Sequence, residues 1–95
     1  MAQQFEWDYA KARENLRKHG VSFEQAGTAF ADPLAVMMID DEHSDEEQRF
    51  ILVGQSYQGQ TLVVVYTERN GTFRLISARP ATRRERWMYE ESREH

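Results

Sequence analysis

The sequence predicts an α+β fold, in which a small antiparallel sheet is flanked by helices in the order β-α-α-β-β-β-β-α. Two observations predict it. The first third of the chain carries helix caps and helically spaced apolar residues, whereas residues 49–79 read as β-rich runs separated by short turns. Asn70-Gly71 is the strongest hairpin signal, because both residues accept the positive φ of a type I′ turn. A chain of 95 residues has room for one domain, residues 1–95.

The N-terminal elements are bounded by recognisable signals. Residues 5–7 alternate apolar and polar and predict a short first strand. Asp8 has the character of a helix N-cap, and Gly20 suits the left-handed position after that helix. Ser22 begins a second short helix, and Pro33 ends it because the residue before a proline is pushed out of helical geometry.

Strands and a last helix follow. Residues 34–39 form a continuous apolar run of strand length, and residues 49–57, 60–69 and 72–79 read as three further strands joined by tight turns. A capping box beginning at Thr82 opens a C-terminal helix that extends to about residue 93. The pattern predicts a three-strand meander plus N-terminal strands, with the helices covering one face of the sheet.

Composition excludes several functional classes. With no cysteine, the chain has no disulfide, thiolate metal site or cysteine nucleophile. The longest apolar run, residues 62–66, is too short to cross a bilayer, and the mixed-charge first twenty residues show no secretory signal. We therefore expect a cytoplasmic protein without membrane contact. No serine lies in a G-x-S-x-G context, so serine hydrolase chemistry has no support.

The net charge of -4 argues at first against a nucleic-acid partner, but the charge is unevenly distributed. Residues 32–49 sum to -6, and six of their carboxylates lie in residues 40–47, a run typical of a solvated loop. Residues 50–95 sum to +2, and all their cations are arginines, whose forked guanidinium suits phosphates and carboxylates.

The arginines are the first candidates for a functional site. Arg49 begins a strand, Arg74 and Arg79 lie on the last strand, and Arg83 opens the final helix. Several arginines beside a helix N-terminus can hold a phosphodiester and stabilise its transition state. Simple alternation places Arg74 and Arg79 on opposite faces, although a bulge near Pro80 would reunite them. The alternative is a surface of ion pairs with the glutamates of the C-terminal half.

The histidines are the second group of candidates. His19 follows Lys18 at a helix C-terminus, where the pair either caps the helix or serves as general acid and phosphate ligand. His43 lies among the loop carboxylates, but the spacing matches no EF-hand, so we expect no metal site there. His95 is terminal. Trp87, Met88 and Tyr89 cannot share one helix face, so at least one should be partly exposed.

These motifs together resemble one known family over nearly the whole chain. The residues that carry the resemblance, in order, are Phe5-Glu6-Trp7-Asp8, Lys11-Ala12, Asn15, Lys18-His19-Gly20-Val21-Ser22-Phe23-Glu24, Asp32-Pro33, Arg49-Phe50, Gly54, Ser56, Val65-Tyr66-Thr67-Glu68-Arg69, Arg74-Leu75-Ile76-Ser77-Ala78-Arg79, Ala81-Thr82, Glu85-Arg86 and Tyr89-Glu90. The pattern is similar to that of the BrnT family of bacterial type II toxins.

The resemblance implies a RelE-like fold and an endoribonuclease that cleaves RNA without a metal or other cofactor, and so inhibits translation. It also implies a cognate BrnA-like antitoxin that neutralises the toxin and contacts operator DNA, which the toxin would meet only through the antitoxin. The family's functional positions map onto Lys18 and His19, and onto Arg49, Arg74 and Arg79, with Glu24 and Tyr89 as weaker candidates. Kinship of fold does not itself assign roles.

Two functional hypotheses follow. In the first, the 2′-hydroxyl of RNA attacks its own phosphorus, Arg74 and Arg79 hold the phosphate, Lys18 adds charge, and His19 or Glu24 moves protons. In the second, the chain is a non-catalytic module that complexes a DNA-binding antitoxin and acts as a co-repressor, which its acidic balance favours. Because carboxylates repel RNA, the first hypothesis predicts that residues 40–47 project away from the Arg74/Arg79 cluster.

Overall fold

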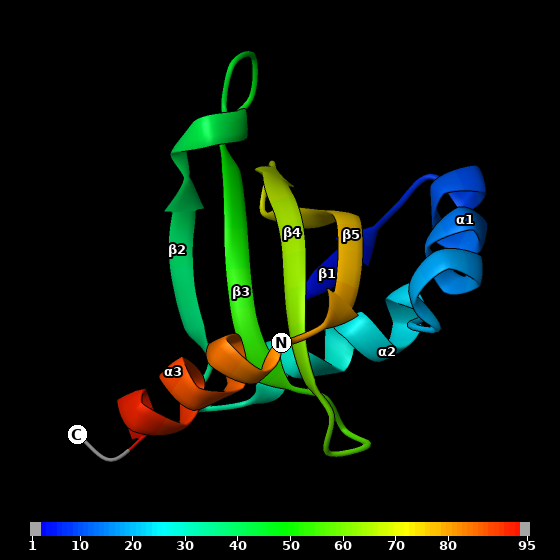
Figure 1. Ribbon diagram of the computed structural model, residues 1–95. Helices are drawn as coiled ribbons and strands as arrows, with labels where there is room; N and C mark the ends of the chain where they lie inside the picture. The colour runs from blue at the N-terminus through cyan, green and yellow to red at the C-terminus, as the bar shows by residue number, and fades with distance from the viewer. Residues whose placement is uncertain (1–2, 94–95) are drawn as a thin grey trace.

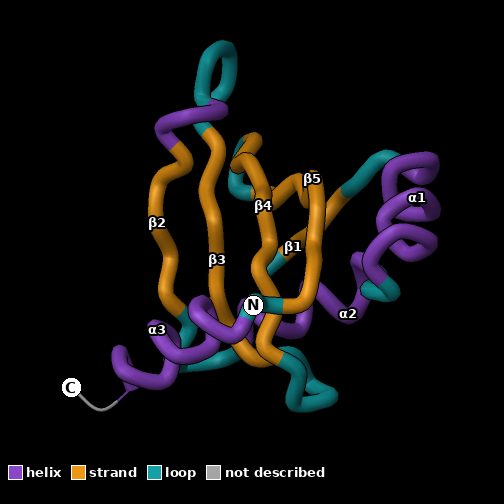
Figure 2. Tube along the Cα trace, in the orientation of Figure 1, coloured by secondary structure: helices purple, strands orange, loops and turns teal. Residues whose placement is uncertain are grey.

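The computed structural model describes residues 3–93 and confirms the α+β class and the predicted order of elements. The strands are β1 (Gln4–Glu6), β2 (Val36–Asp40), β3 (Arg49–Gln55), β4 (Thr61–Arg69) and β5 (Thr72–Pro80), and the α-helices are α1 (Tyr9–His19), α2 (Phe23–Thr28) and α3 (Arg83–Arg93) (Figures 1 and 2). Two short 3-10 helices, Ala29–Ala31 and Asp41–His43, follow α2 and β2. His95 lies outside the described residues.

The helix ends are formed as the sequence predicts. The Asp8 carboxylate accepts bonds from two backbone N–H groups in the first turn of α1, and Gly20 ends this helix with φ of 70°. At α3 the capping box is reciprocal. The Thr82 N–H donates to Glu85 Oε1 at 2.8 Å, and the Glu85 N–H donates to Thr82 Oγ1 at 3.2 Å.

The hairpin between β4 and β5 also matches its sequence signal, with φ of 54° at Asn70 and 83° at Gly71. The predicted strand at residues 34–39 starts two residues late. Leu34 and Ala35 form a turn because their N–H groups bond back to Asp32, through its side chain and its carbonyl oxygen respectively.

The sheet order is β1-β5-β4-β3-β2, so four consecutive strands form an antiparallel meander. β1 pairs parallel with β5, with Phe5 opposite Phe73. The antiparallel sheet that the sequence predicts therefore carries one parallel pairing, at this edge. The pairing joins the first strand to the last across most of the chain, which no local pattern reveals (Figure 1).

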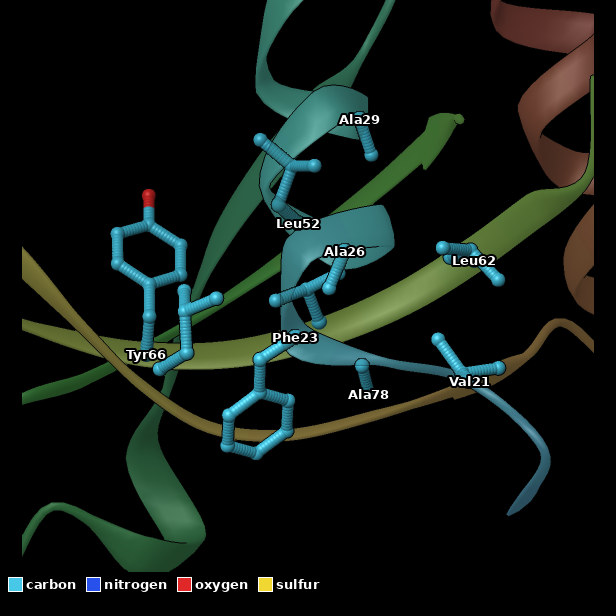
Figure 3. Packing of buried hydrophobic residues seen from close by; sticks show 10 residues of the cluster. Val21, Phe23, Ala26, Ala29, Leu52, Leu62, Tyr66 and Ala78 are labelled. Carbon is cyan, nitrogen blue, oxygen red and sulfur yellow. The ribbon is translucent and has the colours of Figure 1, made fainter. Parts of the chain in front are cut away.

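Helices pack on both faces of the sheet, so the prediction of one covered face was wrong. The larger core lies between α2 and the sheet and includes Phe23, Leu62 and Val64 (Figure 3). A smaller core on the opposite face joins Val63 to Tyr89 of α3. The sequence signal for two covered faces is the uninterrupted apolar run in β4, because neighbouring strand residues point to opposite faces.

Asn15 of α1 forms hydrogen bonds with the edge of β5 at Ala78, beyond the residues of β5 that pair with β1. Its side chain is buried, its Nδ2 donates to the carbonyl oxygen of Ala78 at 2.8 Å, and its Oδ1 accepts from the Ala78 N–H at 3.1 Å. Nδ2 also donates to the carbonyl oxygen of Val21 at 2.9 Å. The amide thus makes the two bonds that a neighbouring strand would make with Ala78.

Candidate functional site

A β-bulge interrupts the pairing of β4 with β5. The register shifts between Val65 and Tyr66, and Ile76 is left without a partner on β4. An extra residue in one strand reverses the alternation of every side chain after it.

The bulge places Arg74 and Arg79 on the same face of the sheet. Arg74 pairs with Thr67 and Arg79 with Val63, and these two β4 residues are four apart and therefore point to one side. Simple alternation would separate the two arginines. The bulge that reunites them lies at Ile76, earlier in β5 than the predicted position near Pro80.

A cavity of about 390 Å³ lies on this face beside Arg74. We call it the cation cavity, because four of its lining residues are the cations Lys11, Arg49, Arg69 and Arg74. They come from α1, β3, β4 and β5. The rest of the lining is Thr67, Ile76, His43, Asp45, Glu46 and Glu47.

The cations of the cavity are partly paired with carboxylates. Arg69 binds Glu47 through two hydrogen bonds of 2.7 and 2.8 Å, and Arg74 Nη1 lies 3.2 Å from Glu6 Oε2. The bonds from Arg69, with the charges of Arg74 and Arg49, lower the pKa of Glu47. The cavity thus brings four cations together, and three carboxylates of the acidic loop already lie against them.

The acidic loop does not project away from this cluster, so that prediction was wrong for Arg74. In Figure 1 the segment between β2 and β3 extends beyond the strand ends, yet Asp45, Glu46 and Glu47 line the cavity with Arg74. The reason is attraction within the chain, because Arg69 at the end of β4 binds Glu47 and holds this part of the loop beside the cavity.

Arg79 lies in a second depression, of about 240 Å³, which we call the apolar groove. Its lining is Val36, Met38, Ile51, Val53, Val63, Arg79, Glu85, Met88, Tyr89 and Ser92. Arg79 binds Glu85 through two hydrogen bonds of 2.7 and 2.8 Å. This pair follows the alternative interpretation of the arginines as ion-pair partners. Arg49 and Arg74 instead line the cation cavity, where Arg74 is paired with Glu6.

We expect Glu85 to make folding pH-dependent, because Arg79 lowers its pKa to about 2 from an ordinary 4.5. A lowered carboxyl pKa gives stability that is present above pH 4.5 and lost as the pH falls toward 2. The pair is partly solvated, so the contribution is about 1–2 kcal/mol. In urea titrations, Glu85→Gln should be less stable than wild type at pH 6 and equally stable near pH 2. An unchanged difference at both pH values would contradict this.

Two further predicted site residues, Tyr89 and Arg83, lie on α3 and differ in their surroundings. The Tyr89 hydroxyl, on a buried side chain, donates to the Asp32 carboxylate, which also accepts the backbone N–H of Gln55 at 2.8 Å. Tyr89 therefore ties α3 to the sheet. Arg83 is exposed at the start of α3. As predicted, not all of Trp87, Met88 and Tyr89 are buried, because Trp87 and Met88 are at least half exposed.

The structure places the remaining predicted site residues elsewhere. Lys18 and His19 lie at the C-terminal end of α1, and neither lines the cation cavity or the apolar groove. Glu24 is exposed on α2 and lines a separate shallow depression with Phe5 and Trp7. Roles for these three residues in catalysis stay predictions.

The sequence patterns do not single out four residues that line the cation cavity, namely Lys11, Thr67, Arg69 and Ile76. Lys11 was interpreted only as a helix former, and Thr67 only as part of a strand, yet both line the cavity. The available signal was the pairing of β4 with β5 at the predicted hairpin, which sets Thr67 beside Arg74. No sequence signal places the first turn of α1 there.

Neither a metal cluster nor a membrane span is found in the part of the chain that the structure describes. Within residues 3–93, no three His, Asp or Glu side chains are grouped so as to hold a metal ion, and His43 Nδ1 lies 3.1 Å from Asp40 Oδ2. Over the same residues, no helix is long and apolar enough to cross a membrane.

The chain was compared with known families and structures. Residues 7–85 match the family described as "Ribonuclease toxin, BrnT, of type II toxin-antitoxin system". The crystal structure of the Brucella abortus ribonuclease toxin BrnT is similar in fold, with a TM-score of 0.65 and 22% identity over 85% of this chain and 99% of that one. No curated protein sequence matches. Because the family match spans most of the chain, this protein belongs to the BrnT family of ribonuclease toxins of type II toxin-antitoxin systems.

Proposed function

We propose that this chain is an active, metal-independent endoribonuclease that inhibits translation in the cytoplasm. The 2′-oxygen of RNA attacks the adjacent phosphorus, and the bond from phosphorus to the 5′-oxygen breaks. The 2′-hydroxyl loses a proton and the departing 5′-oxygen gains one. The products are a 2′,3′-cyclic phosphate and a free 5′-hydroxyl, so atoms and charge balance without a further reactant.

The observation that carries this proposal is the convergence of Lys11, Arg49 and Arg74 on one cavity. Phosphoryl transfer at RNA concentrates negative charge on the non-bridging oxygens in the transition state. Fixed cations in a partly enclosed site stabilise that charge at little reorganisation cost. Arg49 and Arg74 would hold the scissile phosphate, and Arg79, on the same face, would bind a neighbouring phosphate on releasing Glu85.

Proton transfer is assigned to His43, because it lines the cation cavity while its Nδ1 faces Asp40. A carboxylate on Nδ1 orients the ring and leaves Nε2 to exchange a proton. The earlier candidates Lys18 and His19 would take part only if the RNA extended from the cavity along α1. His43 and His19 are thus alternative proton carriers.

The partner of a type II toxin is its cognate antitoxin, and we propose a BrnA-like protein as the partner of this chain. The antitoxin contacts operator DNA, and this chain meets the DNA only through the antitoxin. The apolar groove favours protein binding on this chain, because Met38 and Met88 line it and are about half exposed. This groove also supports the second candidate function, a non-catalytic module that complexes the antitoxin and acts as co-repressor.

Purified chain incubated with RNA and excess EDTA distinguishes the two functions. The nuclease should cleave in chelator and leave 2′,3′-cyclic phosphate ends, which mass spectrometry identifies. Substrates with 2′-deoxy or 2′-O-methyl sugars should resist, because the attacking hydroxyl is absent. Absence of cleavage with every RNA tested, together with tight antitoxin binding, would establish the module instead. Cleavage that stops in EDTA would overturn metal independence.

A further inference from the structure

The hydroxyl of Thr67, a residue that lines the cation cavity, is an anomaly. Thr67 is only 2% exposed, and its Oγ1 is the one buried side-chain nitrogen or oxygen without a hydrogen-bond partner among the described residues. Folded proteins seldom leave such a group unpaired, because its lost hydration is not recovered. The Thr67 hydroxyl is thus a buried donor without an acceptor, next to a cavity.

The surroundings of Thr67 specify what that acceptor is. Arg74 is its direct partner across the strands, and Arg49, Arg69 and Lys11 line the same cavity. Cations attract an anion, and a hydroxyl that donates to a charged oxygen forms a shorter and stronger bond than one that donates to a neutral group. The cavity, of about 390 Å³, is large enough for a phosphate group with its sugar.

The carboxylates that face the cavity cations determine how a phosphate oxygen would reach the Thr67 hydroxyl. Glu6 pairs with Arg74, Glu47 holds Arg69 from the acidic loop, and Asp45 and Glu46 of the same loop also line the cavity. The Glu47–Arg69 pair is close to half exposed, so solvent screens it and it opens readily. Because Thr67 Oγ1 is shielded, an incoming oxygen reaches it only when the side chains that line the cavity move aside.

We propose that Thr67 is a positioning residue, whose hydroxyl donates to a non-bridging oxygen of a phosphate bound by Arg49, Arg74 and Lys11. The site is thus an oxyanion site that recognises the RNA backbone rather than the bases. This deepens the proposed ribonuclease function and rests on it for the identity of the ligand. The binding of phosphate itself does not depend on cleavage.

The proposal makes two expectations of opposite sign for Thr67→Val, which keeps the shape of the side chain and removes the hydroxyl. Stability should rise, because an unpaired buried polar group disappears, and the melting temperature should increase by a few degrees. Oxyanion binding should weaken about tenfold, the effect of one hydrogen bond to a charged group. Thr67→Ser, which restores the hydroxyl, should recover binding.

The experiment titrates inorganic phosphate, and then a short 2′-O-methyl RNA, into the full chain and follows backbone amide shifts by NMR. The control is Thr61→Val, the same change on the same strand and face of the sheet but outside the cavity lining. It should leave both dissociation constants unchanged. Melting curves of all four proteins are recorded with and without phosphate.

The outcomes separate this proposal from the function on which it rests. Weaker binding in Thr67→Val, with recovery in Thr67→Ser, supports the site, even if no variant cleaves RNA and the nuclease proposal fails. Equal binding in wild type and Thr67→Val overturns the site, even if cleavage proceeds, and leaves the hydroxyl with a structural water as its partner. Lost binding in both Thr67 variants also overturns it, because shape would then matter and the hydroxyl would not.

Discussion

Arg74→Ala should reduce the proposed RNA cleavage by about 10²–10³-fold and relieve the growth arrest that such cleavage would cause. Removal of one transition-state donor typically costs this much. Arg74 lies at the cation cavity, and its ion pair with Glu6 is partly solvated. Such a pair contributes at most about 1 kcal/mol to folding, so the variant should remain folded. Single-turnover cleavage and circular dichroism measure the two effects.

Arg17→Ala is the matched control, because Arg17 also forms an ion pair with a glutamate but lies on the exposed side of α1, outside the cation cavity. It should cleave as wild type does. Arg79→Ala locates the scissile phosphate. A larger loss in Arg79→Ala than in Arg74→Ala would move the reaction to the apolar groove. Full activity of a folded Arg74→Ala protein would refute the assignment of this arginine.

Asn15→Ala should cause the second large effect, a loss of about 2–4 kcal/mol in the free energy of unfolding. The change leaves the N–H and carbonyl groups of Ala78 and the carbonyl of Val21 without the amide that they bond. Each buried polar group left unpaired costs about 1–3 kcal/mol, reduced where water enters the space. For a domain of this size, the melting temperature should fall by roughly 10–20 °C.

Thermal and urea unfolding measure this change, and Arg13→Ala serves as its control. Arg13 is exposed on the same helix, so its replacement should alter stability by less than about 0.5 kcal/mol. A melting temperature of Asn15→Ala within a few degrees of wild type would show that water replaces the amide at the edge of β5, and that α1 is held by its apolar contacts alone.

The sequence predicted those parts of the fold that depend on neighbouring residues. Asp8 and Gly20 mark the ends of α1, and Asn70-Gly71 forms its turn, because capping and positive φ are local properties. The bulge at Ile76 was placed only approximately. Its position depends on how two strands align, which side-chain alternation does not determine.

The site was harder to predict because its residues meet through tertiary contacts. Arg49 and Arg74 were recognised as candidates and do line one cavity. Lys11 joins them only through the placement of α1, and Glu47 only through its pairing with Arg69. The run of carboxylates correctly predicted that residues 40–47 are mostly exposed to solvent. It did not predict that this loop lies beside the cation cavity, because that placement depends on the attraction of Glu47 to the distant Arg69.

The parallel pairing of β1 with β5 has a consequence for the order in which the molecule is made. Glu6 of β1 pairs with Arg74 of β5, which follows it by 68 residues. β1 therefore has no partner until β5 has been synthesised. Contacts of such long sequence separation form late and slow the folding of a domain. The cation cavity draws its walls from residues 11 to 76 and is therefore absent from every shorter nascent chain. A nascent chain that has not yet reached residue 76 therefore carries no assembled site.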